Sequence, residues 1–242
     1  PVFLAVIYWI AGLNQWFVVR LVQAALDAVT VVLVERLGRA MFGRGVGLVA
    51  ASLVALSPPL ISSATFVLSE TLYTVALIAS LLVFVRALRE GSVGRGWVAG
   101  ALFSVAALIR PTGLLVPVFA VIATVALSDA VPVKLRLKIG AAACAATALV
   151  VSLWTVRNAL VFKTFIPVAT EFGVTFWIGT YIPWDARWRG WDNISPTREL
   201  LGGLNAYRSK DGVLVDQRMR AAAFRNIAAD PVGQLRFYIR KL

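Results

Sequence analysis

The sequence predicts an all-α protein, a polytopic transmembrane helix bundle followed by an outward-facing, partly irregular C-terminal segment. Of its 242 residues, 60% are hydrophobic and 15% are charged, whereas soluble domains average about 25% charged residues. The mean hydropathy is +0.81, and the apolar residues form long, nearly uncharged runs of the length that crosses a bilayer. These observations exclude a soluble globular domain, a disordered chain and a coiled coil. We expect the bundle over residues 1–162 and the extracytoplasmic segment, with amphipathic helices, over residues 163–242.

Hydropathy divides the bundle into about six spans. Residues 2–13 are apolar but short, which favours a re-entrant or interfacial segment ahead of the first span. The expected spans cover residues 17–37, 46–61, 66–88, 97–109, 113–127 and 139–162.

The positions of the basic residues predict the orientation of the spans. The net charge of +12 would suggest nucleic acid as a partner of a soluble protein, but here the excess lies in three short loops between spans. Those loops contain Arg36, Arg39 and Arg44; Arg86, Arg89 and Arg95; and Lys134, Arg136 and Lys138. The intervening turns carry only Arg110, so the pattern obeys the positive-inside rule. We therefore predict no nucleic-acid partner and a multi-pass protein of the plasma (inner) membrane whose active face is extracytoplasmic.

Cysteine and histidine usage excludes two kinds of site. Cys144 is the single cysteine, so an intrachain disulfide cannot form, and the absence of histidine excludes a zinc site of the His/Cys kind. The chain opens at Pro1 without an initiator Met and ends just after a basic cluster. We therefore expect it to be a fragment of a longer protein.

One expected span is too short, and this places an arginine at membrane depth. Residues 97–109 make roughly 20 Å of helix, whereas the hydrocarbon core is about 30 Å thick. Pro111 then interrupts the helix. Irregular backbone at this depth is tolerated where it is buried in protein or lines a wet cavity. We therefore expect Arg110 at the outer mouth of a cavity.

Polar residues within the first span form a second candidate feature. Arg20, Gln23, Asp27 and Thr30 follow 3, 4, 3 spacing, which puts them on one helix face. Two readings stay open. In the first, Arg20 extends its charged end outward while Asp27 is bonded inside the bundle. In the second, the four polar residues line a substrate cavity.

Two more charged residues lie at the expected outer ends of spans. Glu70, between Ser69 and Thr71, is suited to act as a base, bind a sugar hydroxyl or bind a metal, or is simply stabilised by a helix N-terminus. Arg157 precedes Asn158 and, like Arg110, is suited to phosphate. We expect Glu70, Arg110 and Arg157 to converge on the outer face; the alternative is three unrelated interface anchors.

The C-terminal segment is rich in tryptophan and predicts two helices. Asp211 is suited to cap a helix over residues 212–229, which Pro231 ends, and the Arg-rich residues 232–242 are suited to a membrane surface. The tryptophans stack on sugar rings in one reading and form an interfacial aromatic belt in the other. They are Trp177, Trp184, Trp188 and Trp191.

Several short stretches, taken in their order and spacing, resemble the polytopic GT-C glycosyltransferases. The closest group is the bacterial relatives of protein O-mannosyltransferases and of lipid A aminoarabinose transferases. The resemblance runs from Pro1 to about Gly179 and returns weakly over residues 220–242. The stretches that carry it include Arg20-Leu-Val-Gln-Ala, Ala55-Leu-Ser-Pro-Pro, Ser69-Glu70-Thr71-Leu72, Ile109-Arg110-Pro111-Thr112-Gly113 and Trp154-Thr-Val-Arg157-Asn158.

The resemblance implies transfer of a sugar, with inversion, from a polyprenyl-phosphate carrier to an acceptor protein or lipid glycan at the outer face. It places Glu70 at the family's second acidic position and Arg110 and Arg157 on the carrier phosphate. The further candidate substrate-binding residues are Arg20, Gln23, Asp27, Thr71 and Asn158. A cofactor is not required by the pattern, and a divalent metal with Glu70 as a ligand stays open.

The family's first span and first outer loop are missing here, and with them its main catalytic aspartate, expected upstream of Pro1. We therefore expect these 242 residues to be inactive alone. A transporter or flippase of an anionic lipid-linked substrate is the alternative, because it would use the same arginines; a non-catalytic membrane subunit is the third.

Overall fold

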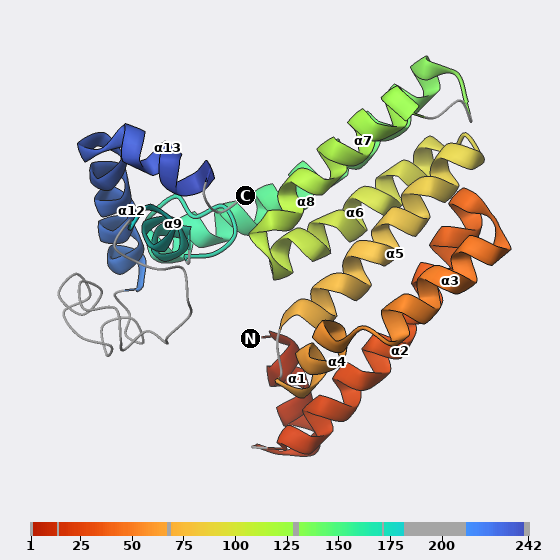
Figure 1. The fold of residues 1–242 in the computed structure, drawn as a ribbon, viewed down its shortest axis with the longest axis horizontal. Coiled ribbons are helices and arrows are strands. Elements are labelled where there is room, and N and C mark those ends of the chain that lie inside the picture. Colours follow the sequence, from red (N-terminus) through yellow and green to blue (C-terminus); the bar gives the residue numbers. More distant parts are fainter. Residues whose placement is uncertain are drawn as a thin grey trace. The chain divides into compact units, whose positions relative to one another are not determined.

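A computed structural model describes residues 2–13, 15–66, 69–127, 131–170, 172–181 and 212–239, and every regular element in those ranges is a helix (Figure 1). The chain divides into two compact units, Pro1–Trp154 and Thr155–Leu242. The predicted all-α class is confirmed, and each unit is described by itself below.

The first unit is a bundle of apolar helices. Three of its helices are long and apolar enough to cross a membrane, α2 (Trp16–Phe42), α5 (Ser69–Arg89) and α8 (Val133–Phe162), the last of which continues into the second unit. The predicted polytopic membrane bundle is thereby confirmed. The shorter elements are α1 (Val2–Ala11), α3 (Arg44–Ala55), α4 (Pro58–Thr65), α6 (Val93–Ile109), the 3₁₀ helix η1 (Pro111–Leu115) and α7 (Val116–Leu127).

The expected single span over residues 46–61 is wrong. The structure has two helices there, because α3 ends at Ala55 and α4 begins at Pro58. Pro58 and Pro59 lack the backbone N–H that a continuous helix needs, but they are well suited to the first positions of a new helix. Hydropathy alone does not register this break, since all the residues around it are apolar or small.

The basic residues expected in loops lie in the end turns of helices. Arg39 is in the last turn of α2, where it pairs with Glu35 at 2.5 Å, and Arg86 and Arg89 are in the last turn of α5. Cations are favourable there because the helix dipole is negative at its C-terminus. Figure 1 shows the α2–α3 and α5–α6 turns at the same end of this unit as the last turn of α7, with α4 and the start of α5 at the other. Helices that cross a membrane in alternating directions require their connecting turns to be grouped in this way.

Small residues bring α6 and α8 into close contact. A Cβ added to Gly96 would lie 2.8 Å from the carbonyl oxygen of Ile139, and one added to Gly100 would collide with that of Ala143. The Thr147 hydroxyl lies 3.0 Å from the Gly100 carbonyl oxygen, to which it donates across the interface. A four-residue spacing of glycines is a common device for close helix packing within membranes.

We expect Gly100→Ala to destabilise the first unit. The new methyl group meets backbone of α8, which cannot move aside as a side chain can, so the helices must separate at a cost of about 1–3 kcal/mol. Gly45→Ala in α3 is the matched control, since nothing lies within 4 Å of its Cβ position. Thermal unfolding in detergent should show a lower Tm for Gly100→Ala alone; equal shifts in both variants would contradict the proposed contact.

The second unit is built on α9 (Phe172–Thr180), α12 (Gly212–Ala229) and α13 (Pro231–Ile239). Its core contains Trp177, Met219 and Ala223 from α9 and α12. Trp177 is 2% exposed and stacks on Tyr181 with ring centroids 5.0 Å apart, so it is a packing residue and is unavailable to a sugar. The other three tryptophans and Asp211 lie outside the described residues.

A buried carboxylate joins α12 to α9. Asp216 Oδ1 accepts a 2.6 Å hydrogen bond from the backbone N–H of Gly173, near the N-terminus of α9, where the helix's own carbonyls cannot reach. Burial raises the pKa of Asp216 above its ordinary value of 3.8, while the Gly173 hydrogen bond and the nearby Arg220 oppose the rise. The N–H donor is therefore satisfied at the cost of burying an acid.

We expect Asp216→Asn to remove a pH dependence of stability. Because the folded pKa is raised, Asp216 favours folding fully below about pH 3.8 and loses this contribution as pH rises through the raised value. Asparagine keeps the acceptor without the charge, so the variant should match the wild type at low pH and exceed it at neutral pH. Asp216→Ala should lose about 1–3 kcal/mol at every pH, since the Gly173 N–H is left unsatisfied. Tm measured against pH distinguishes these outcomes; identical pH profiles for the wild type and Asn variant would contradict the assignment.

Candidate functional site

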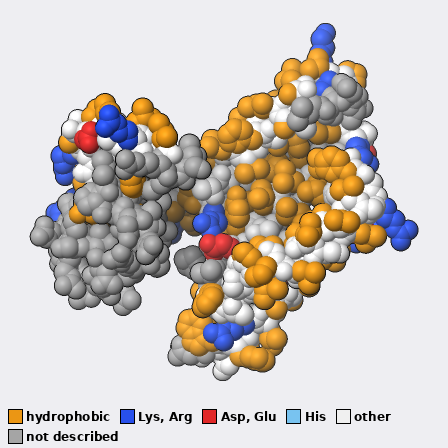
Figure 2. Space-filling model, viewed as in Figure 1, with side chains coloured by type: hydrophobic (Ala, Val, Ile, Leu, Met, Phe, Trp, Pro, Cys, Tyr) orange, Lys and Arg blue, Asp and Glu red, His pale blue; other side chains and the backbone are white. Residues whose placement is uncertain are grey.

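Glu70 and Arg110 form an ion pair between Arg110 Nη1 and Glu70 Oε1, although they are 40 residues apart in sequence. The two side chains are 40% and 38% exposed, respectively, so a ligand can reach both. Figure 2 shows hydrophobic side chains over much of the visible face of the first unit, with few charged groups among them. In such surroundings a carboxylate and a guanidinium are costly unless paired or used.

The chain fixes Arg110 by ending one helix and starting another there. α6 ends at Ile109, Arg110 adopts an extended conformation (φ −138°, ψ 123°), and Pro111 begins η1. The residue before a proline is driven out of the helical region, which accounts for this break. The Arg110 carbonyl accepts a 2.9 Å hydrogen bond from the N–H of Gly113, and its own N–H donates to Ala106. The predicted interruption at Pro111 is confirmed.

Glu70 lies in the first turn of α5, where the helix dipole favours a negative charge. Its backbone carbonyl accepts a 2.8 Å hydrogen bond from the Thr74 hydroxyl. Tyr73, one turn further along, places its ring 6.0 Å from Arg110 Cζ, a cation–π distance. Tyr73 was missed in the sequence, although its i+3 spacing from Glu70 was a signal that both share a helix face.

Thr71 does not share the exposure of Glu70. Its side chain is 1% exposed, and among the described residues its hydroxyl has no hydrogen-bond partner. The structure therefore places Thr71 in the packing next to the ion pair, and a role in substrate binding stays a prediction.

The polar stripe on α2 divides into different environments. Gln23 and Thr30 are each 2% exposed, and Thr30 donates to the Leu26 carbonyl at 3.1 Å. Arg20 is exposed, and Asp27 is half-buried at the edge of a cavity. The 3, 4, 3 spacing predicted a shared helix face but not which of the four side chains would be buried.

Arg157 and Asn158 belong to the second unit. Asn158 is 2% exposed, and its amide donates to the carbonyls of Ile166 and Val168 at 3.1 and 3.4 Å, which holds the chain that follows α8. Arg157 donates to the Asn158 side-chain oxygen at 3.1 Å. The structure brings together Glu70 and Arg110; that Arg157 meets them stays a prediction.

The described residues do not form a metal site on their own. Among them, no group of three His, Cys, Asp or Glu side chains could hold a metal ion. Glu70, the residue suggested as a ligand, is paired with Arg110 instead. We therefore derive no chemical step through a metal.

The fold and the site together define an integral membrane protein whose apolar bundle carries a ligand-accessible carboxylate–guanidinium pair. Residues 1–156 match a protein family described as dolichyl-phosphate-mannose-protein mannosyltransferase, and the chain belongs to this family. It is accordingly a membrane glycosyltransferase of the mannosyltransferase type, as the GT-C resemblance implied. Comparison with curated proteins gave no significant match, and comparison with solved structures gave none. The matched range includes Glu70 and Arg110 and stops just before Arg157.

Proposed function

We propose that the protein transfers a sugar from a polyprenyl-phosphate carrier to an acceptor hydroxyl at the extracytoplasmic membrane face. The observation that supports this most is the ion pair of Glu70 with Arg110, held at a helix break within an apolar bundle. A site for a lipid phosphate needs a cation, access for the carrier, and low-dielectric surroundings in which that cation acts strongly.

Arg110 is proposed to bind the carrier phosphate. The acceptor oxygen attacks the anomeric carbon, the bond from that carbon to the phosphate oxygen breaks, and the polyprenyl phosphate leaves with an added negative charge. A guanidinium fits phosphate geometry with two parallel donors and stabilises this charge. Tyr73 supports Arg110 from one side through its ring.

Glu70 is proposed to accept a hydrogen bond from a hydroxyl of the acceptor or the sugar. The family resemblance puts the principal base, which takes the acceptor's proton, on an aspartate outside these residues. Glu70 then serves as the second acidic residue of the site, and its position in the first turn of α5 is one where the helix dipole favours a negative charge.

The extracytoplasmic face is supported by the positions of the charges. α6 runs for 17 residues from the basic α5–α6 turn to Arg110, roughly 25 Å of helix. The ion pair therefore lies far from the basic end, which the positive-inside rule assigns to the cytoplasm.

Sealed vesicles carrying the protein expressed from its intact gene would test the proposal. Labelled mannosyl polyprenyl phosphate is supplied to the extracytoplasmic face together with membrane acceptors. We expect the label to appear in the acceptor fraction. One molecule of free polyprenyl phosphate should be released for each labelled mannose transferred. Movement of the labelled lipid across the bilayer without transfer would overturn the proposal in favour of a flippase.

A further inference from the structure

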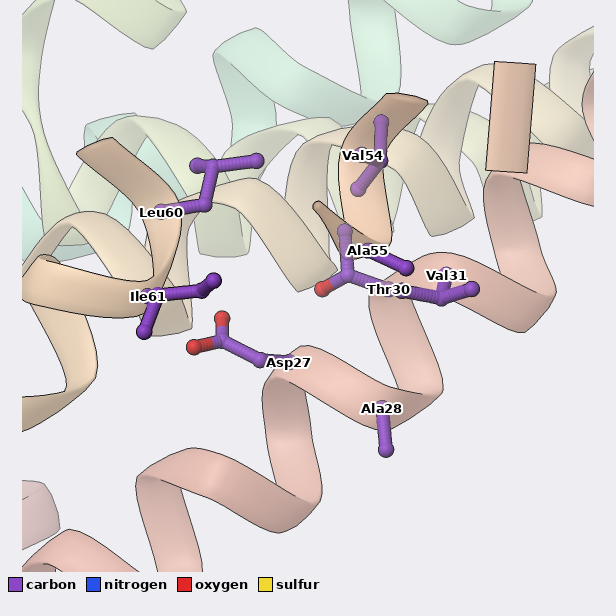
Figure 3. A pocket seen from close by; sticks show the side chains of 8 residues that line it. All are labelled: Asp27, Ala28, Thr30, Val31, Val54, Ala55, Leu60 and Ile61. Atoms are coloured by element: carbon purple, nitrogen blue, oxygen red, sulfur yellow. The ribbon is translucent and has the colours of Figure 1, made fainter. Parts of the chain in front are cut away.

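A second polar feature lies in a cavity that the mechanism above does not use. The cavity has a volume of about 380 Å³, is open on one side, and is lined by α2, the end of α3 and the start of α4 (Figure 3). Its lining residues are Asp27, Ala28, Thr30, Val31, Val54, Ala55, Leu60 and Ile61. The volume falls within the range of about 300–1,000 Å³ that small-molecule sites occupy.

The cavity lies where α3 stops short of the length that crosses a membrane. α3 starts at its basic end with Arg44 and stops after 12 residues, roughly 18 Å of helix, which is less than the hydrocarbon thickness. The chain turns at Leu56 and Ser57 before Pro58 begins α4. Interrupted backbone at this depth requires protein burial or a cavity.

Asp27 is the one charged residue among the described residues that line this cavity. Figure 3 shows its carboxylate directed into the space, toward Ile61 and Leu60. Among the described residues, it makes no ion pair or hydrogen bond, in contrast to Glu35 two turns along the same helix, which pairs with Arg39. An ionisable residue inside a span costs about 2.5–3.5 kcal/mol on insertion scales and marks a functional position by default.

The remaining lining favours a cation and an aliphatic body. Val54 and Ala55 are the last residues of α3, so the negative end of its dipole faces the same space. Thr30 is already bonded to the Leu26 carbonyl, and the other six lining residues are aliphatic. A phosphate would be repelled here, whereas the pair of Glu70 and Arg110 offers a guanidinium.

We propose that this cavity is a second binding site, for the primary ammonium group of an aliphatic amphiphile, with Asp27 as its counter-ion. The ammonium supplies the charge that the carboxylate and the end of α3 lack, and the aliphatic walls take up the adjoining methylene groups. The site is separate from the proposed transfer chemistry, so either proposal can fail without the other.

The test compares three amphiphiles that share one tail. The full chain in an uncharged detergent is titrated with dodecylamine, dodecanol and dodecanoate, and the bound molecules are counted by native mass spectrometry. The wild type should bind the amine at least about tenfold more tightly than the alcohol, a difference of about 1.4 kcal/mol, and the dodecanoate least. Asp27→Asn, which preserves shape and removes charge, should abolish the preference for the amine.

Glu35→Gln and Glu90→Gln are the matched controls, because each removes an acidic group that is already paired. Both should keep the amine preference of the wild type. The Tm of each variant establishes that it is folded, and Asp27→Leu gives a second variant that fits the aliphatic walls. Equal binding of amine and alcohol by the wild type, or an amine preference that survives Asp27→Asn, would overturn the proposal.

Discussion

Arg110→Ala should lower sugar transfer by about 100- to 1,000-fold, the usual effect of removing one donor that stabilises charge in a transition state. The change removes the guanidinium proposed to hold the leaving phosphate and also leaves Glu70 without its partner. If the loss is confined to the transition state, kcat falls while KM for the donor changes less. Initial rates measured with labelled mannosyl polyprenyl phosphate and the intact gene product provide both parameters.

Arg95→Ala is the control for that experiment. Arg95 lies near the other end of the same helix and pairs with Glu90, so the variant removes an exposed arginine and an ion pair without touching the proposed site. It should retain full transfer. Arg110→Lys should recover part of the activity, because an ammonium keeps the charge but not the two parallel donors. Full activity in Arg110→Ala would remove the main support for the site.

The class of the fold was predictable because hydropathy and charge are properties of single residues. The long apolar runs predicted α2, α5 and α8, which are the helices of spanning length. The division of α3 from α4 was missed, although Pro58 and Pro59 carried the signal, because an average over apolar residues hides a backbone effect. The close approach of α6 and α8 depends on which side chains are absent, as at Gly100.

The candidate site was predictable in its members and less so in its contacts. Glu70 and Arg110 attracted attention because ionisable groups are rare in spans, but their pairing joins positions 40 residues apart and depends on how α5 and α6 pack. Trp177 shows the reverse problem, since an interfacial tryptophan and a core tryptophan look alike in sequence. The amide of Asn158 donates to two backbone carbonyls, which sequence alone does not indicate, and its role in substrate binding stays a prediction.

The ion pair of Glu70 with Arg110 leads to a different expectation for substitution of Glu70. In the structure the Arg110 guanidinium is engaged by the Glu70 carboxylate, so a phosphate must compete for it. Glu70→Gln removes that competition. Exposed ion pairs contribute about 0.2–1 kcal/mol, so polyprenyl phosphate without a sugar should bind up to about fivefold more tightly to the variant. Transfer should nevertheless fall by about 10- to 150-fold, because a hydrogen bond to a charged group contributes about 1.5–3 kcal/mol that the neutral amide does not supply.

Tighter binding of polyprenyl phosphate together with slower transfer would distinguish the proposed role of Glu70 from a role in substrate binding alone. A carboxylate that only contacts substrate would weaken binding and transfer together when it is removed. Glu90→Gln is the matched control, since it breaks the Glu90–Arg95 pair on the far turn and should change neither quantity. Binding is measured with polyprenyl phosphate and, separately, with the uncharged polyprenol, which lacks the group that Arg110 would hold. Tighter binding of both lipids would indicate a general loosening of the bundle, and weaker binding of the phosphate alone would show that Glu70 supports the phosphate site rather than competing with it.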